Sequence, residues 1–497
     1  MNPLQIAKTL KDDYLKLLRS EFRPRQERLR DAFEAEITRE GFLTREPFIA
    51  LAQPFAIAPP MAQLQPETRR LFAAIAERPY AHQAAACERI AAGKPAIVCT
   101  GTGSGKTEAF QIPIVDQCIR TRGGPPSVKA IFVYPMNALA TDQRNRLRSV
   151  LPGSGVSYGR YTGDTQLMGS RPSDLPDEER CLRQEFRDAP PDLLLTNYQM
   201  LEYMLLRGDG RDIFHNHRVR YVVLDEVHTY GGALGTDVAL LLRRLRAALK
   251  AGWPEGPEPI FIGTSATLQS GEAGRDPALE VAEFFSKLTG QATPPEAVIR
   301  EVTEPPAKPA GLTLGPAPDI TEGDLSGFDA PEVHPWESPS VLALARKLVG
   351  AAPDDPRNLP TLWSGTSLPY RLMEWLSEPR TLADVVTELA QTPERAGVPV
   401  EALEREVEAA LLVGPCLPPE SPLCLRPRVH LFLRGLARFW RCSNPDCARL
   451  LDAERDTCDT CGSKALPLAL CRTCGWDFLV GFRPEEQLPH AVPLQPW

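Results

Sequence analysis

The sequence lacks any apolar run long enough to span a membrane. No stretch of its 497 residues approaches the roughly 18 consecutive apolar residues that a transmembrane helix needs. The N-terminus carries charged residues where the apolar core of a signal peptide would lie, namely Lys8, Lys11, Asp12 and Asp13. We therefore expect a cytoplasmic protein without a membrane partner.

The sequence also has no excess of basic residues. It contains 56 Lys and Arg against 64 Asp and Glu, and the net charge of −8 argues against a uniformly basic coat for nucleic acid. A local groove needs only a few Arg or Lys contacts with phosphate, so the net charge is compatible with a nucleic-acid partner.

Cysteine is sparse outside one region of the chain. Six of the 12 cysteines lie between Cys442 and Cys474, and the other six are scattered. This clustering favours a metal site in a reducing compartment over a framework of disulfides.

Patterning divides the chain into several parts. Short apolar runs alternate with amphipathic helical patterns between residues 61 and 285, which predicts an α/β fold whose parallel sheet is covered by helices on both faces. Proline-rich sequence follows, and it cannot sustain a long helix or a central strand. The expected parts are an N-terminal helical segment (1–60), the α/β domain (61–285), a Pro-rich linker (286–340), a helical accessory domain (341–430), a cysteine-rich zinc-binding module (431–480) and a tail (481–497).

A glycine-rich stretch, TGTGSGKT from Thr100 to Thr107, follows a strand-like apolar run and precedes a helical pattern. In such a P-loop, backbone N–H groups at the start of the helix face phosphate oxygens, the lysine bridges the β- and γ-phosphates, and the threonine hydroxyl holds Mg²⁺. A glycine-rich surface turn is the alternative, which the flanking strand and helix disfavour. The stretch predicts an ATP site that includes Thr102, Gly103, Ser104, Gly105, Lys106 and Thr107.

Two carboxylates follow another apolar run, YVVL, downstream of the P-loop. At the end of a buried strand, Asp225 would orient Mg²⁺ through water, and Glu226 would polarise the water that attacks the γ-phosphate. An acidic pair that only caps a strand is the alternative. The position after four apolar residues favours the catalytic interpretation.

These motifs occur in the order of the superfamily 2 DEAD/DEAH-box helicases, which the chain resembles over about residues 75–275. The P-loop is similar to motif I, Asp225–His228 (DEVH) to motif II, and Gly263–Leu268 (GTSATL) to motif III. The resemblance is greatest to large bacterial DNA helicases of repair and phage-defence systems. It implies a RecA-like P-loop NTPase lobe and a nucleic-acid partner, with DNA favoured over RNA.

The resemblance also implies roles for single residues. Tyr80 and Gln83, in RPYAHQ, would stack on adenine and read its edge, with ordinary packing and capping as the alternative. His228, counted here with the catalytic residues, would couple the phosphate state to motion between lobes together with Ser265 and Thr267. Taken alone, that histidine is more typical of a core residue.

Three further segments resemble the nucleic-acid-facing motifs of the same fold: Tyr134–Gln143, Tyr161–Thr165 and Thr196–Leu206. Polar groups at strand ends and helix starts suit contacts with the phosphate backbone that ignore base sequence. Solvated loops are the alternative. The candidate contacts are Asn137, Gln143, Arg144, Thr162 and Thr196.

The clustered cysteines form three pairs, which are Cys442-x4-Cys447, Cys458-x2-Cys461-Gly and Cys471-x2-Cys474-Gly. Two thiolates separated by two residues and followed by glycine make a tight turn that aims both sulfurs at one tetrahedral metal. Zn²⁺ is therefore preferred over an iron–sulfur cluster or disulfides. Six thiolates are too many for one zinc ion and too few for two four-thiolate sites. The first two pairs are the preferred ligands, with the third pair as substitutes or a free redox pair.

The segment before this cluster interleaves cations with aromatic rings: Arg426, Arg428, Arg434, Arg438 and Arg441 with Phe432, Phe439 and Trp440. The pattern fits a grip on a nucleic-acid strand by charge and stacking. It fits an amphipathic helix that packs its aromatic residues equally well, and the sequence leaves both interpretations open.

The sequence lacks a recognisable second RecA-like lobe, which in a superfamily 2 motor supplies an arginine that stabilises charge on the transferring phosphate. Nothing between residues 285 and 441 resembles the Gln-x-x-Gly-Arg-x-x-Arg pattern of motif VI. We therefore expect the ATP-binding half of a helicase, completed by a second polypeptide or a missing region. An ATP- and nucleic-acid-binding interaction subunit with little turnover is the alternative. If this chain holds the arginine, the first positions to test are Arg346, Arg371 and Arg380.

Overall fold

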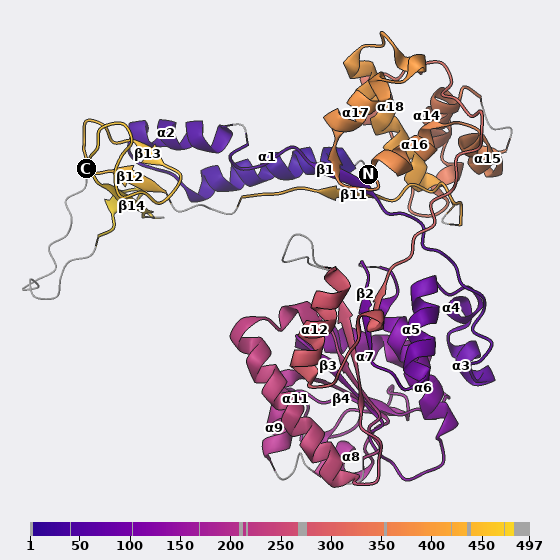
Figure 1. Cartoon of the computed structure of the whole chain (residues 1–497). Coiled ribbons are helices and arrows are strands. Elements are labelled where there is room, and N and C mark those ends of the chain that lie inside the picture. The colour runs from indigo at the N-terminus through magenta and orange to yellow at the C-terminus, as the bar shows by residue number, and fades with distance from the viewer. Residues whose placement is uncertain are drawn as a thin grey trace, which may run out of the picture. The chain divides into compact units, whose positions relative to one another are not determined.

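The structure is a computed structural model, shown in Figure 1, and the chain forms two units, residues 55–304 and residues 1–54 with 305–497. The described residues are 3–39, 41–101, 103–167, 169–207, 212–214, 217–266, 276–351, 355–418, 420–434, 439–471 and 473–481. Among them, no helix is both long and apolar enough to cross a membrane.

The unit of residues 55–304 is built on an eight-stranded sheet in the order β5-β4-β6-β3-β7-β8-β2-β9, and every pair in it is parallel. The central strands are buried along their whole length, which is typical of a parallel sheet covered on both faces. The strands are β2 (Ala96–Cys99), β3 (Ala130–Tyr134), β4 (Tyr158–Arg160), β5 (Glu179–Arg180), β6 (Leu193–Asn197), β7 (Tyr221–Leu224), β8 (Ile260–Ser265) and β9 (Val298–Arg300).

Helices cover both faces of this sheet, as Figure 1 shows for α5 and α6 on one side and α11 and α12 on the other. Successive strand residues point to opposite faces, so Val98 belongs to one core and Ile97 to the other. The first core takes residues from α3 (Pro66–Leu71), α4 (Ala73–Glu77), α5 (Ala81–Ala91), α6 (Lys106–Arg120) and α7 (Asn137–Val150), and the second from α8 (Arg183–Asp188), α9 (Tyr198–Leu206), α11 (Gly232–Gly252) and α12 (Pro277–Thr289). The predicted α/β fold with a RecA-like lobe is confirmed.

The other unit contains a helical part with its own core around Trp363, Leu372 and Val407. A buried ion pair joins Arg395 Nη2 to Glu406 Oε1 at 2.5 Å, so neither charge is left without a partner. The helices are α13 (Glu322–Ser326), α14 (Pro339–Val349), α15 (Leu359–Ser364), α16 (Leu368–Trp375), α17 (Leu382–Ala390) and α18 (Val400–Val413). A three-stranded antiparallel sheet accompanies them, in the order β10 (Arg380–Thr381), β1 (Phe48–Leu51) and β11 (Pro427–His430).

The same unit contains two N-terminal helices, α1 (Pro3–Glu21) and α2 (Glu27–Thr38), and the cysteine module. The module is a four-stranded antiparallel sheet in the order β13 (Leu450–Leu451), β12 (Trp440–Cys442), β14 (Ala465–Leu470) and β15 (Asp477–Leu479). Phe33 of α2 packs against Phe439 at a centroid distance of 5.7 Å, and Arg39 forms an ion pair with Asp452 at 2.8 Å. The N-terminal segment thus packs on the module that follows it by 400 residues in sequence.

The stretch for which a Pro-rich linker is predicted contains two elements with defined contacts. Strand β9 pairs with β2 at the edge of the parallel sheet, and Leu325 of α13 joins the core of the helical part. The domain boundaries drawn from the sequence stay predictions.

Candidate ATP site and cysteine cluster

The register of the parallel sheet brings the predicted ATP-site segments together. Strand β2 pairs with β8 so that Cys99 lies opposite Ser265, and β7 pairs with β8 so that Leu224 lies opposite Gly263. The carboxyl ends of parallel strands share one edge of the sheet, which is where ligands bind in open α/β folds. The P-loop after β2 and the acidic pair after β7 therefore meet at this edge.

The P-loop is held by hydrogen bonds between its own residues. The Thr100 hydroxyl donates to Ser104 Oγ at 2.6 Å, and the Ser104 hydroxyl donates to the Gly101 carbonyl at 2.8 Å. Thr100, which stands where the simple P-loop pattern has glycine, thus contributes a hydrogen bond that glycine could not make. Gly103 and Gly105 have φ values of 78° and 73°, in the left-handed region that favours glycine. Thr102 lies outside the described residues.

Helix α6 begins at Lys106 directly after this loop, and Thr107 occupies its first turn. The described loop therefore ends at a helix N-terminus, where backbone N–H groups and the helix dipole favour a phosphate. The local geometry fits the nucleotide phosphates for which the sequence predicts this site.

Helix α5 braces the loop from the side. The His82 Nε2–H donates to the Ser104 carbonyl at 2.8 Å, and Gln83 Nε2 donates to the Gly105 carbonyl at 3.2 Å. Burial lowers the pKa of His82, which keeps the ring neutral near pH 7. Sequence reasoning missed His82, although it stands between the two residues singled out in RPYAHQ.

Tyr80 and Gln83 also contact groups within the protein. The Gln83 Oε1 accepts a hydrogen bond from the Tyr80 backbone N–H at 3.0 Å, which caps the start of α5. The Tyr80 ring lies 4.8 Å from the Phe55 ring and 5.6 Å from the His82 ring, between centroids. These contacts fix both side chains beside the loop, and their predicted contact with adenine stays a prediction.

Lys106 and the acidic pair lie at the same edge. Lys106 Nζ is 3.7 Å from Glu226 Oε1 and 3.5 Å from the Ser265 carbonyl. The Thr264 hydroxyl donates to Asp225, and it accepts from the Glu226 backbone N–H at 3.0 Å. Burial raises the pKa of Asp225, because desolvation disfavours its charged form. A cation bound at this carboxylate would favour the charged form instead.

Thr264 is a second residue that sequence reasoning missed. It belongs to the GTSATL segment, in which only the following Ser265 and Thr267 were assigned roles. In the buried strand β8 it orients both the Asp225 side chain and the Glu226 backbone, and Glu226 adopts an unusual positive φ of 49° there. Strained backbone of this kind persists only where neighbouring contacts hold it.

His228 joins the acidic pair to β8. Its Nδ1 is 3.2 Å from Glu226 Oε2 and 3.3 Å from Ser265 Oγ. This places His228 between the two motifs that it was expected to couple, but the coupling role itself stays a prediction. Thr267 lies outside the described residues.

Glu301, which no sequence motif marks, also reaches the loop. Its Oε2 accepts a hydrogen bond from the Gly101 backbone N–H at 2.9 Å. Glu301 follows β9 directly, so the pairing of β9 with β2 brings it to the loop from some 200 residues away in sequence.

The predicted nucleic-acid contacts lie near the ends of β3, β4 and β6 of the same sheet. The Thr196 hydroxyl donates to the Tyr161 carbonyl at 2.8 Å, and both Thr196 and Thr162 are 0% exposed. The Thr162 hydroxyl donates to Asp164. These two threonines therefore fix loops from within, and their contact with a strand stays a prediction.

The remaining candidates lie on α7. Asn137, at its start, is exposed and accepts a hydrogen bond from Asn197 Nδ2 at 2.6 Å. Gln143 is buried, and Arg144 Nε lies 3.8 Å from Glu179 Oε1. Of the five candidates, Asn137 is thus the one whose side chain is exposed at the carboxyl edge.

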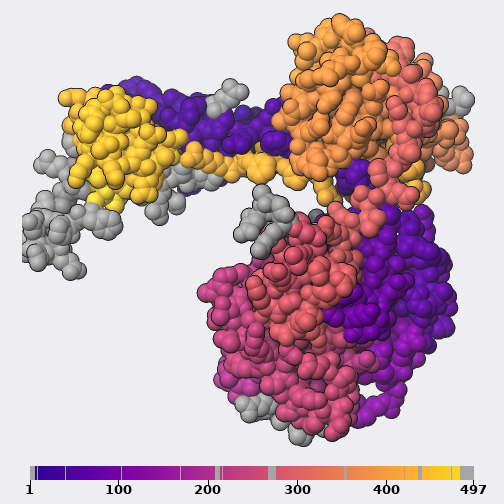
Figure 2. All heavy atoms as spheres, in the orientation of Figure 1, coloured from indigo at the N-terminus to yellow at the C-terminus, as the bar shows by residue number. Residues whose placement is uncertain are grey.

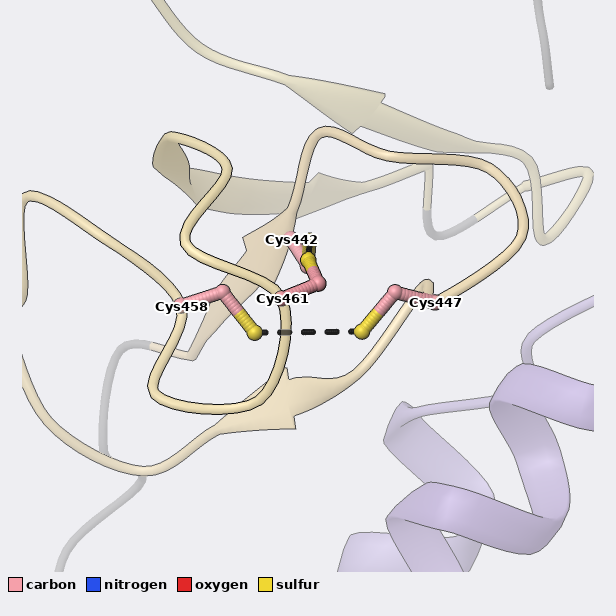
Figure 3. A group of neighbouring side chains, drawn as sticks. All are labelled: Cys442, Cys447, Cys458 and Cys461. Atoms are coloured by element: carbon pink, nitrogen blue, oxygen red, sulfur yellow. Dashed lines mark hydrogen bonds between the residues drawn. The ribbon is translucent and has the colours of Figure 1, made fainter.

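Four cysteines converge in the cysteine module, as Figure 3 shows. The sulfur atoms of Cys442, Cys447, Cys458 and Cys461 all lie within 4.8 Å of one another. The pair from Cys442 to Cys461 is separated by 3.3 Å, and the pair from Cys447 to Cys458 by 3.8 Å. Four sulfurs about 2.3 Å from one tetrahedral Zn²⁺ would be separated by about 3.8 Å, so the four thiols fit zinc. They are the set preferred from the sequence.

The turn around the second pair suits metal binding. Backbone N–H groups, first that of Thr460, hold the pKa of the Cys458 thiol below its ordinary value. Gly462, directly after Cys461, has a φ of 73° that closes the turn. Both features favour thiolates that point to one ion.

Cys471 and Cys474 are not part of this group of four. Their turn is closed by a hydrogen bond from the Gly475 N–H to the Cys471 carbonyl at 2.9 Å, and the Gly475 carbonyl accepts from the Arg25 N–H at 2.8 Å. The Arg25 guanidinium lies 5.1 Å from the centre of the Trp476 ring. The third pair thus lies against the segment between α1 and α2.

The segment rich in arginine and aromatic residues is extended wherever it is described, so the amphipathic-helix interpretation is wrong for those residues. Residues 427–430 form β11, and 440–442 form β12. Phe439 is buried, and Arg441 forms a buried ion pair with Asp477, whereas Phe432 is 61% exposed. Backbone pairing with β1 and β14, both distant in sequence, overrides the helical pattern. Arg438 lies outside the described residues.

Comparison with known proteins gives the family. The DEAD/DEAH box helicase family matches residues 80–273, which contain the P-loop, the acidic pair and the GTSATL segment. The chain carries a DEAD/DEAH box helicase domain. This confirms the resemblance drawn from the motifs.

Curated relatives match different lengths of the chain. The Druantia protein DruE of Escherichia coli (strain UMEA 4076-1) is 27% identical over 82% of this chain and 29% of its own length. The Lhr helicase/uracil glycosylase of Escherichia coli (strain K12) is 32% identical over 44% of this chain and 14% of its own length. The chain thus spans less than a third of each relative. The crystal structure of the DUF1998 helicase MrfA bound to DNA aligns with a TM-score of 0.40 and 23% identity, over 55% of this chain and 34% of that one.

Proposed function

We propose that the unit of residues 55–304 binds ATP with Mg²⁺ and is the ATP-binding half of a nucleic-acid helicase or translocase. The convergence of Lys106 with Asp225 and Glu226, at the helix start that follows β2, is the observation that supports this most strongly. A phosphate at the N-terminus of α6 would lie beside one lysine and two carboxylates, the set that phosphoryl transfer uses for charge, metal and water.

The chemistry assigns a distinct role to each of these side chains. Lys106 would neutralise charge on the β- and γ-phosphates, and Asp225, held by Thr264, would orient Mg²⁺. Glu226 would polarise the attacking water, and its contact with His228 at 3.2 Å would report the state of the γ-phosphate to Ser265. Bound Mg²⁺ would neutralise charge that develops on the phosphate oxygens.

The motor needs one further group, an arginine from a facing lobe. In the described part of the chain, Lys106 Nζ lies 3.7 Å from Glu226 Oε1 and His228 Nδ1 lies 3.2 Å from Glu226 Oε2, and no arginine forms an ion pair with Glu226 or Asp225. We infer that a second RecA-like lobe, on another polypeptide or on a further region of a longer protein, supplies it. We also propose DNA as the strand, on the resemblance to repair and defence helicases.

The four-cysteine group would hold one Zn²⁺ through Cys442, Cys447, Cys458 and Cys461. Zinc at such a site supplies folding free energy rather than catalysis, because four thiolates leave no open position. Its place in the proposed function is to keep the module folded against α2.

Substitution of Glu226 with Gln tests the catalytic assignment. The amide keeps the volume of the side chain but cannot polarise water, so we expect ATP binding within a fewfold of the parent and turnover lower by about 100-fold or more. Equilibrium binding of labelled ATP and steady-state hydrolysis, with and without single-stranded DNA or RNA of one sequence, measure both. Hydrolysis at the parental rate would contradict the assignment, and equal stimulation by RNA would contradict the preference for DNA.

An ATP- and nucleic-acid-binding interaction subunit is the second candidate function. The same lack of an arginine beside Glu226 in the described residues favours it. The two candidates differ in one result. A subunit of this kind would bind ATP and strand but stay without turnover when the second lobe is added, whereas half of a motor would become active.

A further inference from the structure

A pocket of about 800 Å³ lies beside the antiparallel pair of β1 and β11, in the unit that holds the cysteine module. Two segments distant in sequence line it, residues 41–48 and 430–434. The extended second segment runs beside the N-terminal helices, as the yellow and indigo atoms show in Figure 2, and the Tyr14 hydroxyl donates to the Arg434 carbonyl at 2.8 Å.

Backbone pairing fixes the shape of this pocket. Phe48 lies opposite His430 in the ladder, and the Arg434 backbone N–H donates to the Leu43 carbonyl at 2.7 Å. Because the β1–β11 ladder and the bridge between Thr44 and Leu433 join the two lining segments, the pocket is formed before any ligand binds. A preformed site loses little conformational entropy on binding.

One face of the extended segment carries basic side chains and an aromatic ring. Arg428, His430, Phe432 and Arg434 stand at every second position and are all exposed, which is how one face of a strand is presented to solvent. The Phe432 ring packs edge-on against Phe48 at 6.3 Å between centroids and otherwise lies open. A large ring in this position offers a flat surface to a ligand.

The lining of the pocket holds basic but no acidic side chains, in a chain whose net charge is −8. Arg45, His430 and Arg434 contribute to its lining, and none of the described lining residues is acidic. Arg45 is exposed and has no ion pair within the described residues. The Arg434 guanidinium lies 4.6 Å from the centre of the Phe42 ring, which holds it in place by a cation–π contact. Arg434 Nη1 also lies 3.9 Å from Oδ2 of Asp452, a carboxylate outside the lining that pairs with Arg39 at 2.8 Å. Three rings and three basic side chains in the lining are complementary to a polyanion with flat bases.

We propose that this pocket binds single-stranded nucleic acid, with a base stacked on Phe432 and phosphates held by Arg45 and Arg434. Stacking on aromatic side chains in a basic groove is the general means by which proteins bind single strands without regard to sequence. The inference rests on the proposed function only for the kind of partner, because the pocket lies outside the α/β unit and its contacts do not require ATP.

Binding of the full chain to a fluorescein-labelled oligo(dT) of about 20 nucleotides, without nucleotide and by fluorescence anisotropy, tests the pocket directly. We expect Phe432→Ala to weaken binding about tenfold, since stacking on one ring contributes this much or more. Phe432→Tyr keeps the ring face and should bind within twofold of the parent. The ring is largely exposed, so its truncation leaves the cores unchanged.

The charged side of the pocket is tested by Arg45→Gln. We expect weaker binding of several fold and a salt dependence whose logarithmic slope falls by about 0.7, the value for one lost phosphate contact on a single strand. Arg357→Gln is the matched control, because Arg357 is an exposed arginine of the same unit outside the pocket lining. It should bind like the parent with the parental slope.

Parental affinity and slope in both Phe432→Ala and Arg45→Gln would overturn the proposal. If these two variants changed the self-association of the chain, measured by sedimentation, but not its binding to the strand, the proposal would also be overturned. The pocket would then be an interface between copies of the chain.

Photo-cross-linking of the parent chain to a bromodeoxyuridine strand should label the peptide that contains Phe432. Labelling confined to the α/β unit would contradict the proposal. These differences in strand binding are measured without nucleotide. We therefore expect them even if the chain does not hydrolyse ATP.

Discussion

The α/β unit and the cysteine module hold their candidate sites in different ways. In the α/β unit, cores on both faces of an eight-stranded sheet support the ATP site, and His82 and Gln83 brace the P-loop through hydrogen bonds. In the module, strands of two to six residues surround four thiols whose sulfur atoms lie within 4.8 Å of one another. The first site is formed by protein contacts alone, whereas we propose that the geometry of the second depends on a bound ion.

Removal of metal should show this difference most strongly. Zinc binding contributes about 10 to 16 kcal/mol to small modules of this kind, more than their cores can replace. We therefore expect a chelator to unfold β12 and β14 while β3 and β7 keep their structure. Hydrogen exchange of the four strands measures this, and metal analysis of the untreated chain should give about one zinc per chain.

A pair of cysteine variants sharpens this prediction. Cys442→Ser should lose the zinc, whereas Cys474→Ser should retain it, because Cys474 lies outside the group of four. Retention of zinc by Cys442→Ser would contradict the assignment of the ligands. Equal protection of all four strands from hydrogen exchange after chelation would show that the two regions do not differ in their dependence on metal.

Lys106→Ala should affect the function of the α/β unit without affecting its fold. The change removes the positive charge that would face the β- and γ-phosphates, so we expect ATP affinity to fall by about 100-fold. The side chain contributes nothing to either core, and the melting temperature should stay within a few degrees. Calorimetric titration with ATP and a melting curve measure the two effects. Parental ATP affinity would show that the loop is not the phosphate site.

Gly105→Ala should give the smallest of the three effects, a local loss of stability. A Cβ at this position would lie 2.2 Å from Gln83 Nε2 and would sit on backbone with a φ of 73°. We expect a loss of about 1 to 3 kcal/mol in the free energy of unfolding, measured in urea. Gly153→Ala is the control, because its φ is 77° but nothing lies within 4 Å of the added Cβ. Equal losses in both variants would mean that the contact of α5 with the P-loop contributes nothing to the free energy of unfolding.

The two regions also differ in how far the sequence predicts them. The P-loop and the acidic pair are local patterns in regular strand–helix alternation, so the fold and the meeting of Lys106 with Glu226 follow from the sequence and the rule that parallel strands share their carboxyl edge. His82, Thr264 and Glu301 were missed because their hydrogen bonds to the site depend on which strands are neighbours, and no local pattern marks that.

In the cysteine module, spacing predicted the kind of metal but left the choice of four ligands to a preference. The structure brings the preferred four cysteines together because β12 pairs with β14, which places Cys442 beside the turn that carries Cys458 and Cys461. The segment from Arg426 to Arg441 shows the limit of periodicity, since a pattern that also fits a helix is extended once β1 and β14 offer it partners.

The central proposal is that the ATP site of this chain is formed and that a second RecA-like lobe supplies the arginine that completes it. Steady-state ATP hydrolysis by the purified chain, with single-stranded DNA and with or without the polypeptide that carries the second RecA-like lobe, tests it most directly. We predict ATP binding with very slow hydrolysis by the chain alone, and a rise of about 10³- to 10⁵-fold on addition of the second lobe, the range that such an arginine contributes. Robust DNA-stimulated hydrolysis by a chain shown to be monomeric would contradict the claim and would direct the search to Arg346, Arg371 and Arg380.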